Sequence, residues 1–233
     1  MEYTALATDY DGTIACEGKV DRLTVAALER ARRAGLTLVM VTGRELVDLF
    51  NTFPDCHLFH RIVAENGAVV YTPENNTLRA LATGPPPLLL EVLTRHAVPF
   101  SVGHSIVATV EPHEHTVLSA IHDLGLAWHV IFNKGSVMAL PSDVTKATGL
   151  LAALRELVLP IEQVVGVGDA ENDLPFLHVC GLSVAVANAL PVVKQHVDLV
   201  MERERGAGVI ELIEGVLTSR PLRQASPGRS VKS

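Results

Sequence analysis

Aromatic residues and cysteines are scarce in this chain, and both shortages limit its class. Phe, Trp and Tyr make up only 4 % of the 233 residues, so a core must be built mainly from Leu, Val, Ala and Ile, which suits a buried parallel sheet. The three cysteines, Cys16, Cys56 and Cys180, are odd in number and form no Cys-x-x-Cys pair. We therefore expect free thiols in a reducing compartment rather than a disulfide framework.

The chain also lacks an excess of positive charge and a long apolar run. Its formal net charge is −7, which argues against nucleic acid as a partner, because such binding depends on clustered Lys and Arg. A small anionic substrate is compatible, since local charge and a metal can outweigh the net charge. No run approaches membrane-spanning length, and the N-terminus begins without a basic or apolar leader. We expect a soluble, cytoplasmic protein with no membrane partner; the sequence indicates no oligomeric state.

Apolar runs alternate with helical patterns along most of the chain. Hydrophobic residues make up 48 % of the sequence, and its length suits one large domain or a domain with an insert. The alternation predicts an α/β fold with a Rossmann-like, doubly wound and mostly parallel sheet. We expect its strands at 4–8, 36–41, 61–64, 68–71, 163–167, 183–187 and 198–201. Its helices are expected at 22–34, from 45, at 146–158 and at 209–217.

The pattern changes between residues 81 and 141. Gly84 and the three prolines after it mark a break, and helical and β patterns then follow in the order αββαββ. We therefore predict a small α+β domain at 81–141, inserted into a catalytic core made of residues 1–80 and 142–217. The tail at 218–233 contains no acidic residue and is expected to be disordered.

Four short stretches carry groups that suit phosphate chemistry. All but the lone lysine directly follow a predicted strand, and doubly wound sheets bind ligands beyond the carboxyl ends of their strands. The first offers two carboxylates, and the second offers a hydroxyl and a backbone N–H that glycine lets a ligand approach. The stretches are Asp9–Thr13, Val41–Arg44, Lys146 and Gly168–Asp173.

Taken singly, these residues have simpler interpretations. Asp9 and Asp11 are common turn formers, Thr42 suits a helix N-cap, and Arg44 suits a surface ion pair. Lys146 is otherwise an exposed lysine, although a lysine at a helix start opposes the helix dipole. Acidic residues enriched at a helix N-terminus account for one aspartate of the fourth stretch, but not for its spacing.

Two rival motifs fail on spacing. An EF-hand that opens at Asp9 needs an acidic residue where Val20 stands, and a dinucleotide fingerprint needs glycine where Glu171 stands. His113 and His115 lack a third metal ligand at a suitable spacing, so a solvated helix start is the better interpretation of that pair.

Together and in this order, the four stretches resemble the haloacid dehalogenase superfamily. This family consists mostly of magnesium-dependent phosphatases that use an aspartate nucleophile, and the resemblance extends from about residue 4 to residue 215. It implies that the first strand lies between the second and the fourth. Asp9, Thr42 and Asp169 would then meet at one crevice.

The resemblance also implies catalytic roles. Asp9 would attack phosphorus and form an aspartyl-phosphate, while Asp11 would protonate the leaving oxygen and then activate water. Lys146 would hold the nucleophile and the phosphoryl oxygens, and Thr42 would bind a phosphoryl oxygen.

A magnesium ion is implied by the same resemblance. Mg²⁺ suits an all-oxygen set of ligands, here Asp9, the carbonyl of Asp11 and Asp169, with Asp173 as a ligand or an orienting group. Contacts to the substrate are expected from Gly43, Arg44 and Asn172.

The insert resembles the C2-type cap of the family's IIB branch, and its small size is similar to that of phosphoglycolate and sugar-phosphate phosphatases. The segments 184–189 and 206–209 also look like that branch, although many relatives have Asp where this chain has Ala207. The resemblance implies a Mg²⁺-dependent phosphomonoesterase acting on a small phosphorylated metabolite. The alternatives are a sugar phosphomutase with the same chemistry, and a silent binding module, which would typically have lost Asp9, Asp11 or Lys146.

Side-chain alternation predicts which face of the insert meets the substrate. The residues expected to pack on the insert's helices are Trp128, Val130 and Phe132, together with Ile106, Ala108 and Val110. The residues expected on the open face are His129, Ile131 and Asn133, together with Ser105, Val107 and Thr109. We expect the open face to close over the crevice, with His129 as its polar contact; an ordinary half-exposed position is the alternative for His129.

Overall fold

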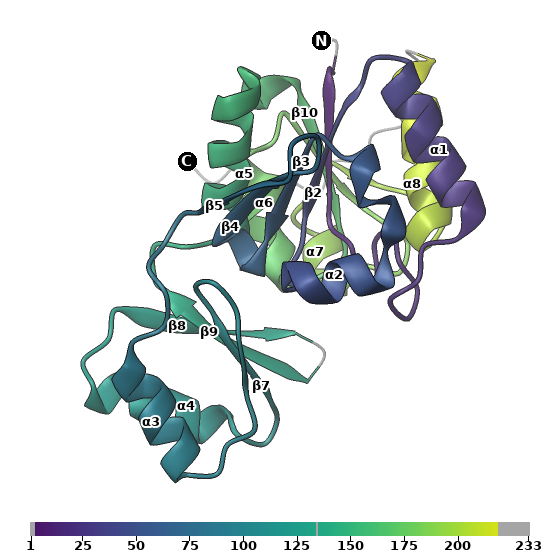
Figure 1. Ribbon diagram of the computed structural model, residues 1–233. Coiled ribbons are helices and arrows are strands. Elements are labelled where there is room, and N and C mark those ends of the chain that lie inside the picture. The colour runs from purple at the N-terminus through teal and green to yellow at the C-terminus, as the bar shows by residue number, and fades with distance from the viewer. Residues whose placement is uncertain (1–2, 134, 219–233) are drawn as a thin grey trace, which may run out of the picture.

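The computed structural model describes residues 3–133 and 135–218, and its largest element is a mostly parallel sheet of eight strands. The strand order is β12-β11-β10-β1-β2-β3-β4-β5, in which the pairs β3–β4 and β4–β5 are antiparallel and the other pairs are parallel (Figure 1). The strands are β1 (Ala5–Thr8), β2 (Thr37–Val41), β3 (Arg61–Ala64), β4 (Val69–Thr72), β5 (Thr77–Ala80), β10 (Val164–Gly168), β11 (Leu182–Ala185) and β12 (Leu199–Val200). The α/β prediction is confirmed.

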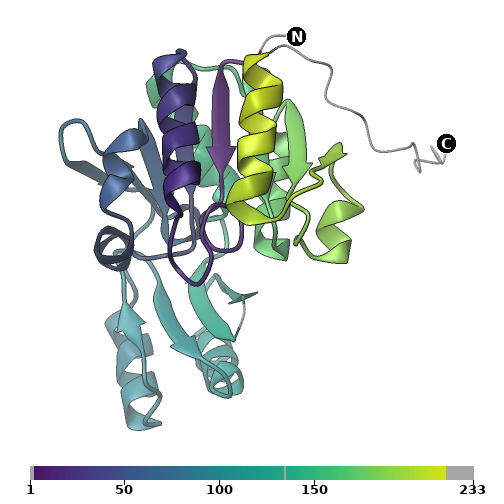
Figure 2. The same ribbon diagram turned by 90° about the vertical axis from the view of Figure 1, so that its right-hand side faces the viewer.

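Helices cover both faces of this sheet. The first and last helices lie side by side on one face, and Figure 2 shows them in front of the sheet. Two helices that contact each other cover the other face, against β3 and β10 respectively. The four helices are α1 (Arg22–Arg33), α8 (Arg205–Leu217), α5 (Lys146–Leu157) and α6 (Leu174–Val179). Between these layers β1 and β10 are entirely buried, as their apolar runs predict.

Local sequence explains where helix α1 begins and ends. The carboxylate of Asp21 accepts the N–H groups of Leu23 and Thr24 and so caps α1. Gly35 follows the helix with a φ of +91°, a conformation that glycine adopts freely.

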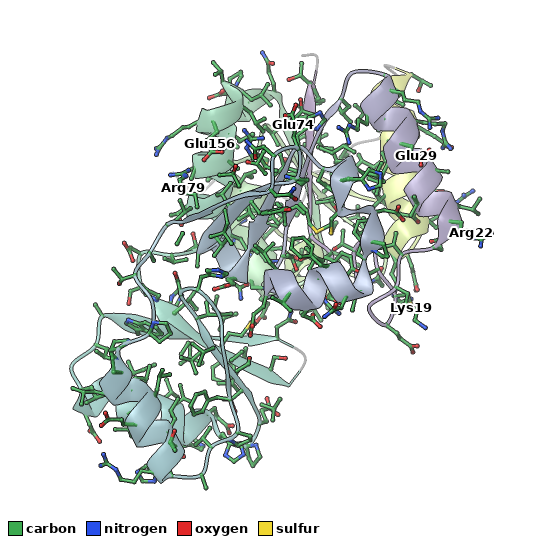
Figure 3. The ribbon with its side chains drawn as sticks, viewed as in Figure 1. Lys19, Arg22, Glu29, Glu74, Arg79 and Glu156 are labelled. Carbon is green, nitrogen blue, oxygen red and sulfur yellow. The ribbon has the colours of Figure 1, made fainter. Side chains whose placement is uncertain are left out.

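On the far face, Glu156 of α5 pairs with Arg61 of β3 and Arg79 of β5, and Figure 3 shows Arg79 and Glu156 close together. This pairing ties α5 to the antiparallel edge of the sheet.

A second, antiparallel sheet lies apart from the first, with the order β6-β7-β9-β8 (Figure 1). The chain enters it after β5 and returns to the large sheet after β9. Two helices pack on one of its faces over a small apolar cluster of their own. Its elements are α3 (Pro87–Arg95), β6 (Ser101–Val102), β7 (Val107–Val110), α4 (Glu114–Asp123), β8 (Trp128–Asn133) and β9 (Ser136–Pro141). The αββαββ order is as predicted, and the exact boundaries 81–141 stay a prediction.

The prediction of which residues of the small sheet pack on its helices is confirmed in part for β8 and is wrong for β7. Trp128 and Val130 pack in the apolar cluster under the helices, but Phe132 is 50 % exposed. Val107, which was expected on the open face, is buried in that same cluster because it pairs with Ala139, the partner of Val130. Thr109 is likewise buried, and Val110, expected to pack, is 52 % exposed. Since paired residues share a face, the order β7-β9-β8 fixes this outcome.

The open face of the small sheet is therefore built from a corrected set of residues. On β8 it keeps Ile131, which packs against the core of the large sheet. Its cross-strand neighbour on β9 is Met138, and the next residue across, on β7, is Ala108. Ile106, which directly precedes β7, belongs to the large core cluster. This face points to the large sheet, as expected.

Several short elements complete the chain. The helices are α2 (Leu46–Thr52) and α7 (Pro191–Lys194), and the 3-10 turns are η1 (Pro54–Leu58), η2 (Glu65–Gly67), η3 (Ile161–Gln163) and η4 (Glu171–Asp173). All three cysteines are unpaired, as expected, and burial raises the thiol pKa of both Cys56 and Cys180 to about 12. Within residues 3–133 and 135–218, every helix is too short or too polar to cross a bilayer. The tail beyond Thr218 lies outside the described residues.

Candidate active site

The sheet brings three of the predicted strand-end motifs together. β1 lies between β10 and β2 and pairs with both in parallel, so Asp9, Asp169 and Thr42 leave the same edge of the sheet on neighbouring strands. The N–H of Asp9 donates to the carbonyl of Val167 at 3.0 Å, which continues the ladder up to the carboxylate. β1 thus lies between β2 and β10, the strand that directly precedes Asp169, and the crevice expected at this edge stays a prediction.

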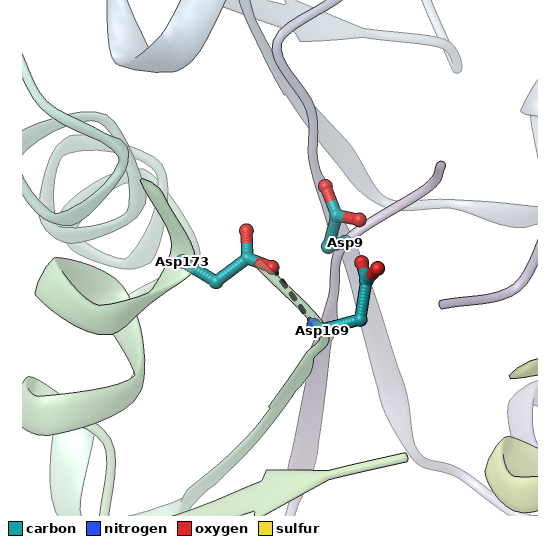
Figure 4. A group of neighbouring side chains, drawn as sticks. All are labelled: Asp9, Asp169 and Asp173. Carbon is teal, nitrogen blue, oxygen red and sulfur yellow. Dashed lines mark hydrogen bonds between the residues drawn. The ribbon is translucent and has the colours of Figure 1, made fainter. Parts of the chain in front are cut away.

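Three buried carboxylates meet at this edge. Oxygen atoms of Asp9, Asp169 and Asp173 all lie within 4.8 Å of one another, and each of the three residues is buried. Figure 4 shows the three side chains turned toward a common space. An all-oxygen donor set of this kind fits a hard divalent cation such as Mg²⁺.

Lys146, the first residue of α5, supplies a positive charge beside this cluster. Its Nζ donates to Oδ1 of Asp9 and to Oδ1 of Asp173, each at 2.6 Å, and the side chain is only 2 % exposed. The side chain of Thr145 caps the helix by accepting the N–H of Thr148. The interpretation of Lys146 as an exposed lysine is therefore wrong, and its place at an unfavourable helix start is stabilised by two carboxylates.

The charges in this cluster do not balance. Burial and the neighbouring Asp173 raise the pKa of Asp9 from 3.8 to about 8, although Lys146 works in the opposite direction. Burial acts to lower the pKa of Lys146, but Asp173 and Asp9 outweigh it, so that pKa is raised. One ammonium group among three buried carboxylates leaves negative charge that a divalent cation would neutralise.

Asp173 organises the loop that carries Asp169. Its Oδ2 accepts the N–H groups of Asp169 and Ala170, both at 2.9 Å, while its Oδ1 accepts from Lys146. A Cβ at Gly168 would lie 2.7 Å from Oδ2 of Asp173, so this close approach requires glycine. With both oxygens engaged, Asp173 is better placed to orient Asp169 than to act as a main metal ligand.

Arg44 contacts Asp11 rather than an open space. Its Nε and Nη2 donate to the two carboxylate oxygens of Asp11 at 2.7 and 2.8 Å, and its Nη1 donates to Asp48 at 2.6 Å. A two-point contact with a planar guanidinium fixes the direction of a carboxylate. The structure thus places Arg44 as an orienting partner of Asp11, and its expected contact with substrate stays a prediction.

Thr42 and Gly43 form a tight turn at the end of β2. The hydroxyl of Thr42 accepts the N–H of Arg44 at 3.1 Å, and the residue is fully buried. The N-cap of α2 is Glu45, so the alternative interpretation of Thr42 as a helix cap is wrong. A Cβ at Gly43 would lie 3.2 Å from the Asn66 side chain. Because glycine has no side chain, its backbone can lie this close to Asn66.

Asn66 joins parts of the site that the sequence motifs treat as separate. Its N–H donates to the carbonyl of Thr42, its Oδ1 accepts from Asn172, and its Nδ2 donates to the sulfur of Met138 in the small sheet, each at 3.1 Å. The turn carrying it was predicted only as a hairpin connection between β3 and β4, which it is. Its place two residues after the end of β3 was the signal for a further role.

His129 lies on β8, on the predicted open face. Burial lowers its pKa, and its Nε2 is a buried atom with no hydrogen-bond partner among the described residues. Because protein atoms cover Nε2, the role of His129 as a substrate contact requires a shift of the small sheet, and it stays a prediction.

Two comparisons with known proteins agree with this geometry. The model of the haloacid dehalogenase-like hydrolase family matches residues 6–84 and 121–213. The phosphoglycolate phosphatase of Methanothermobacter thermautotrophicus is 32 % identical over 220 residues, which cover 90 % of this chain and 96 % of that protein. Phosphoglycolate phosphatase 2 of Saccharolobus solfataricus is 27 % identical and is matched over 92 % of its length.

Solved structures share the fold. A haloacid dehalogenase-like hydrolase from Bacteroides thetaiotaomicron superposes with a TM-score of 0.78 at 19 % identity, over 92 % of this chain and all of that one. A subclass IIB sugar phosphatase of the superfamily gives a TM-score of 0.73 at 19 % identity over 91 % of this chain and 99 % of that one. With the family model and the curated phosphatases matched along nearly all of the catalytic sheet, the chain belongs to the haloacid dehalogenase-like hydrolase family and is a phosphatase.

Proposed function

We propose that this phosphatase is a Mg²⁺-dependent phosphomonoesterase that forms an aspartyl-phosphate on Asp9. The observation that carries the proposal is the set of three buried carboxylates around Lys146, with Asp11 held nearby by Arg44. Its substrate is a small phosphorylated metabolite of the phosphoglycolate or sugar-phosphate class, in line with the names of the curated relatives and of the IIB structural neighbour.

The metal site in this proposal consists of Asp9, Asp169 and the carbonyl of Asp11, with Asp173 as the group that orients the loop. The fit rests on the chemistry of the donors, which are all oxygens, and on the unbalanced negative charge of the buried cluster. When bound, Mg²⁺ would neutralise charge on the phosphoryl oxygens and on the carboxylates.

Asp9 is the nucleophile because it lies at the end of β1, with one oxygen held by Lys146 at 2.6 Å. The ammonium group keeps the carboxylate oriented and adds positive charge where the phosphoryl oxygens arrive. Thr42 and the backbone at Gly43 bound the same crevice and are proposed to donate to a phosphoryl oxygen. Asn172, held by Asn66 at 3.1 Å, is proposed to contact the substrate or its loop.

Asp11 is the acid and base of the reaction. It donates a proton to the leaving oxygen as the bond to phosphorus breaks, and it then removes a proton from the water that attacks the aspartyl-phosphate. Arg44 donates to both oxygens of this carboxylate, so one of these two hydrogen bonds must break before Asp11 carries the proton. We propose that the insert at 81–141 acts as a cap over this end of the crevice, with the core at 1–80 and 142–217.

The proposal is tested with a panel of phosphomonoesters and a phosphate-release assay on the full chain. We expect release with Mg²⁺, loss of release after chelation, and recovery when Mg²⁺ is returned. Ca²⁺ should support turnover poorly, because its looser and higher coordination does not fit in-line transfer. Unchanged release after exhaustive chelation contradicts the proposal, and activation by a sugar bisphosphate with slow phosphoenzyme hydrolysis would indicate a mutase instead.

A further inference from the structure

A pocket opens between α2 and the small sheet, next to the candidate active site. Its volume is about 450 Å³, a value that includes the open solvent at its mouth. Its lining residues are Glu45, Leu46, Val47, Glu65, Val102, Gly103 and His104.

Two residues that line the pocket, Glu45 and Glu65, are adjacent in sequence to Arg44 and Asn66 of the candidate active site. Glu45 directly follows Arg44, which holds Asp11, and the N–H of Glu65 donates to the carbonyl of Arg44 at 3.0 Å. Glu65 in turn precedes Asn66, whose N–H donates to Thr42. Binding of the leaving group in this pocket requires a substrate whose phosphoryl group is at Asp9 to extend past Asp11.

Glu65 fixes the part of the small sheet that faces the pocket. Its side chain is only 1 % exposed, and its oxygens accept the backbone N–H groups of His104 and Ser105 at 2.9 and 3.0 Å. A Cβ at Gly103 would come within 2.7 Å of this carboxyl group. Ser101 adds a second tie by donating to Glu45 at 2.6 Å. The segment 101–105, which consists of β6 and the start of the loop after it, is thus attached to the core at two points.

The same carboxylate sets the hydrogen-bonding character of His104. Ring atom Nδ1 lies 3.1 Å from Oε1 of Glu65, and a carboxylate that already accepts two backbone N–H groups is an acceptor for Nδ1–H as well. In the neutral ring Nε2 is then an acceptor. The side chain is 47 % exposed and lines the pocket, so Nε2 is open to a ligand.

The charges of the pocket disfavour a second anionic group on the substrate. Its described lining includes the carboxylates of Glu45 and Glu65 but no Lys or Arg. The nearby guanidinium of Arg44 already contacts both Asp11 and Asp48. Acceptors at Glu45 and His104 suit hydroxyl donors, whereas a carboxylate placed beside them meets like charge.

We propose that His104, oriented by Glu65, is a specificity residue that accepts a hydroxyl from the leaving group, so that the enzyme favours polyol or sugar phosphates over carboxylate-bearing esters such as phosphoglycolate. This inference rests on the proposed function and narrows its substrate class. It assigns the cap contact to a loop between β6 and β7, and not to the buried Nε2 of His129.

The test compares kcat/KM for glycerol phosphate, phosphoglycolate and nitrophenyl phosphate. We expect the wild-type enzyme to prefer glycerol phosphate over phosphoglycolate by about tenfold or more. His104→Leu should lower kcat/KM for glycerol phosphate by about tenfold and leave nitrophenyl phosphate nearly unchanged, because the aryl group offers no hydroxyl to the pocket. His104→Gln, whose amide oxygen can accept near the position of Nε2, should retain most of the activity.

Two further variants sharpen the result. Glu65→Gln should weaken glycerol phosphate turnover selectively, since it keeps only one acceptor oxygen and sets an NH₂ donor against the N–H of either His104 or Ser105, which disturbs the orientation of His104; its folding is checked by thermal unfolding. His122→Leu is the matched control, because this exposed histidine lies on α4 outside the pocket, and it should change nothing. A wild-type preference for phosphoglycolate, or an equal effect of His104→Leu on all three esters, overturns the inference. Failure of Mg²⁺-dependent nitrophenyl phosphate hydrolysis by the wild-type enzyme overturns the proposed function instead.

Discussion

At the scale of single residues, Lys146 and the carboxylates around it decide how the catalytic crevice is charged. The ammonium group is buried and bonded to Asp9 and Asp173 at 2.6 Å, while Asp169 of the same cluster lies within 4.8 Å of both. A buried ion pair is costly unless every charge has a partner. Lys146 and the three carboxylates therefore leave net negative charge in the cluster, which the proposed Mg²⁺ would neutralise.

The role of Asp9 predicts a large loss of activity on isosteric replacement. Asp9→Asn keeps the shape of the side chain but removes the nucleophile and one proposed metal ligand, so kcat should fall by several orders of magnitude. Steady-state kinetics with nitrophenyl phosphate measures this, and circular dichroism confirms that the variant folds. A variant that keeps more than about a tenth of wild-type kcat, a loss below ~1.4 kcal/mol, contradicts the assignment.

The raised pKa of Asp9 predicts a pH dependence of stability without metal. Burial and Asp173 move this pKa from 3.8 to about 8, so the folded state holds the proton more tightly than the unfolded chain. The contribution to the free energy of unfolding is then fully present below the unfolded pKa and is lost as pH rises through the folded one. In chelator, Tm of the wild-type protein should fall more between about pH 5 and pH 8 than Tm of Asp9→Asn. Parallel profiles for the two proteins would contradict this.

At the scale of elements, the turn between β3 and β4 positions the start of α5. Glu65, Asn66 and Gly67 all have φ values between +52° and +109°, a strained region for the first two. A Cβ at Gly67 would lie 1.9 Å from the carbonyl oxygen of Thr145, which is the residue before Lys146. The turn and the helix start can approach this closely only because Gly67 has no side chain.

This contact predicts different costs for two glycine substitutions. Gly67→Ala combines a positive φ with a clash against backbone, and its free energy of unfolding should fall by more than about 3 kcal/mol. Gly35→Ala is the matched control, with a φ of +91° and nothing within 4 Å, and should cost only about 1 kcal/mol. Urea denaturation measures both values. Similar losses for the two variants would show that the contact with Thr145 is unimportant.

The elements that the sequence predicted well are those with strong local signals. β1, β2 and β10 are apolar runs that end at Asp9, Thr42 and Asp169. Continuous apolar runs of this kind are typical of buried parallel strands. β5 was not predicted because all four of its residues are exposed. Its position depends on the ladder with β4, which is a pairing and not a property of the segment.

Pairing also explains the errors within the site and the insert. Each alternating set of β7 contains one valine, so the sequence could not show that Val107 shares a face with Ala139 and Val130. Glu65 and Asn66 had the local appearance of a turn, and their bonds reach His104 and Asn172. Contacts between residues so far apart in the chain follow from the fold and not from local pattern.

At the scale of the whole molecule, the two sheets have separate proposed roles. The large sheet carries at one edge the residues proposed to bind the phosphoryl group and the metal. The small sheet faces the large sheet with the segment 101–105 and β8. The two parts are joined by hydrogen bonds from Asn66 to Met138, from His104 to Glu65 and from Ser101 to Glu45. In the proposed function the insert selects the leaving group while the catalytic groups of the large sheet stay fixed.

The central claim, a phosphoryl group carried by Asp9, is tested most directly by trapping it. In Asp11→Asn, nitrophenyl phosphate should still transfer its phosphoryl group, since nitrophenolate needs little protonation, but the base for the second step is missing. With Mg²⁺ present, we expect a burst of about one nitrophenolate per enzyme followed by slow turnover. Acid quench and mass spectrometry should then find one added phosphoryl group on the peptide that contains Asp9, and none in a variant that also carries Asp9→Asn. The absence of a burst, or a phosphoryl group on another peptide, would contradict the account.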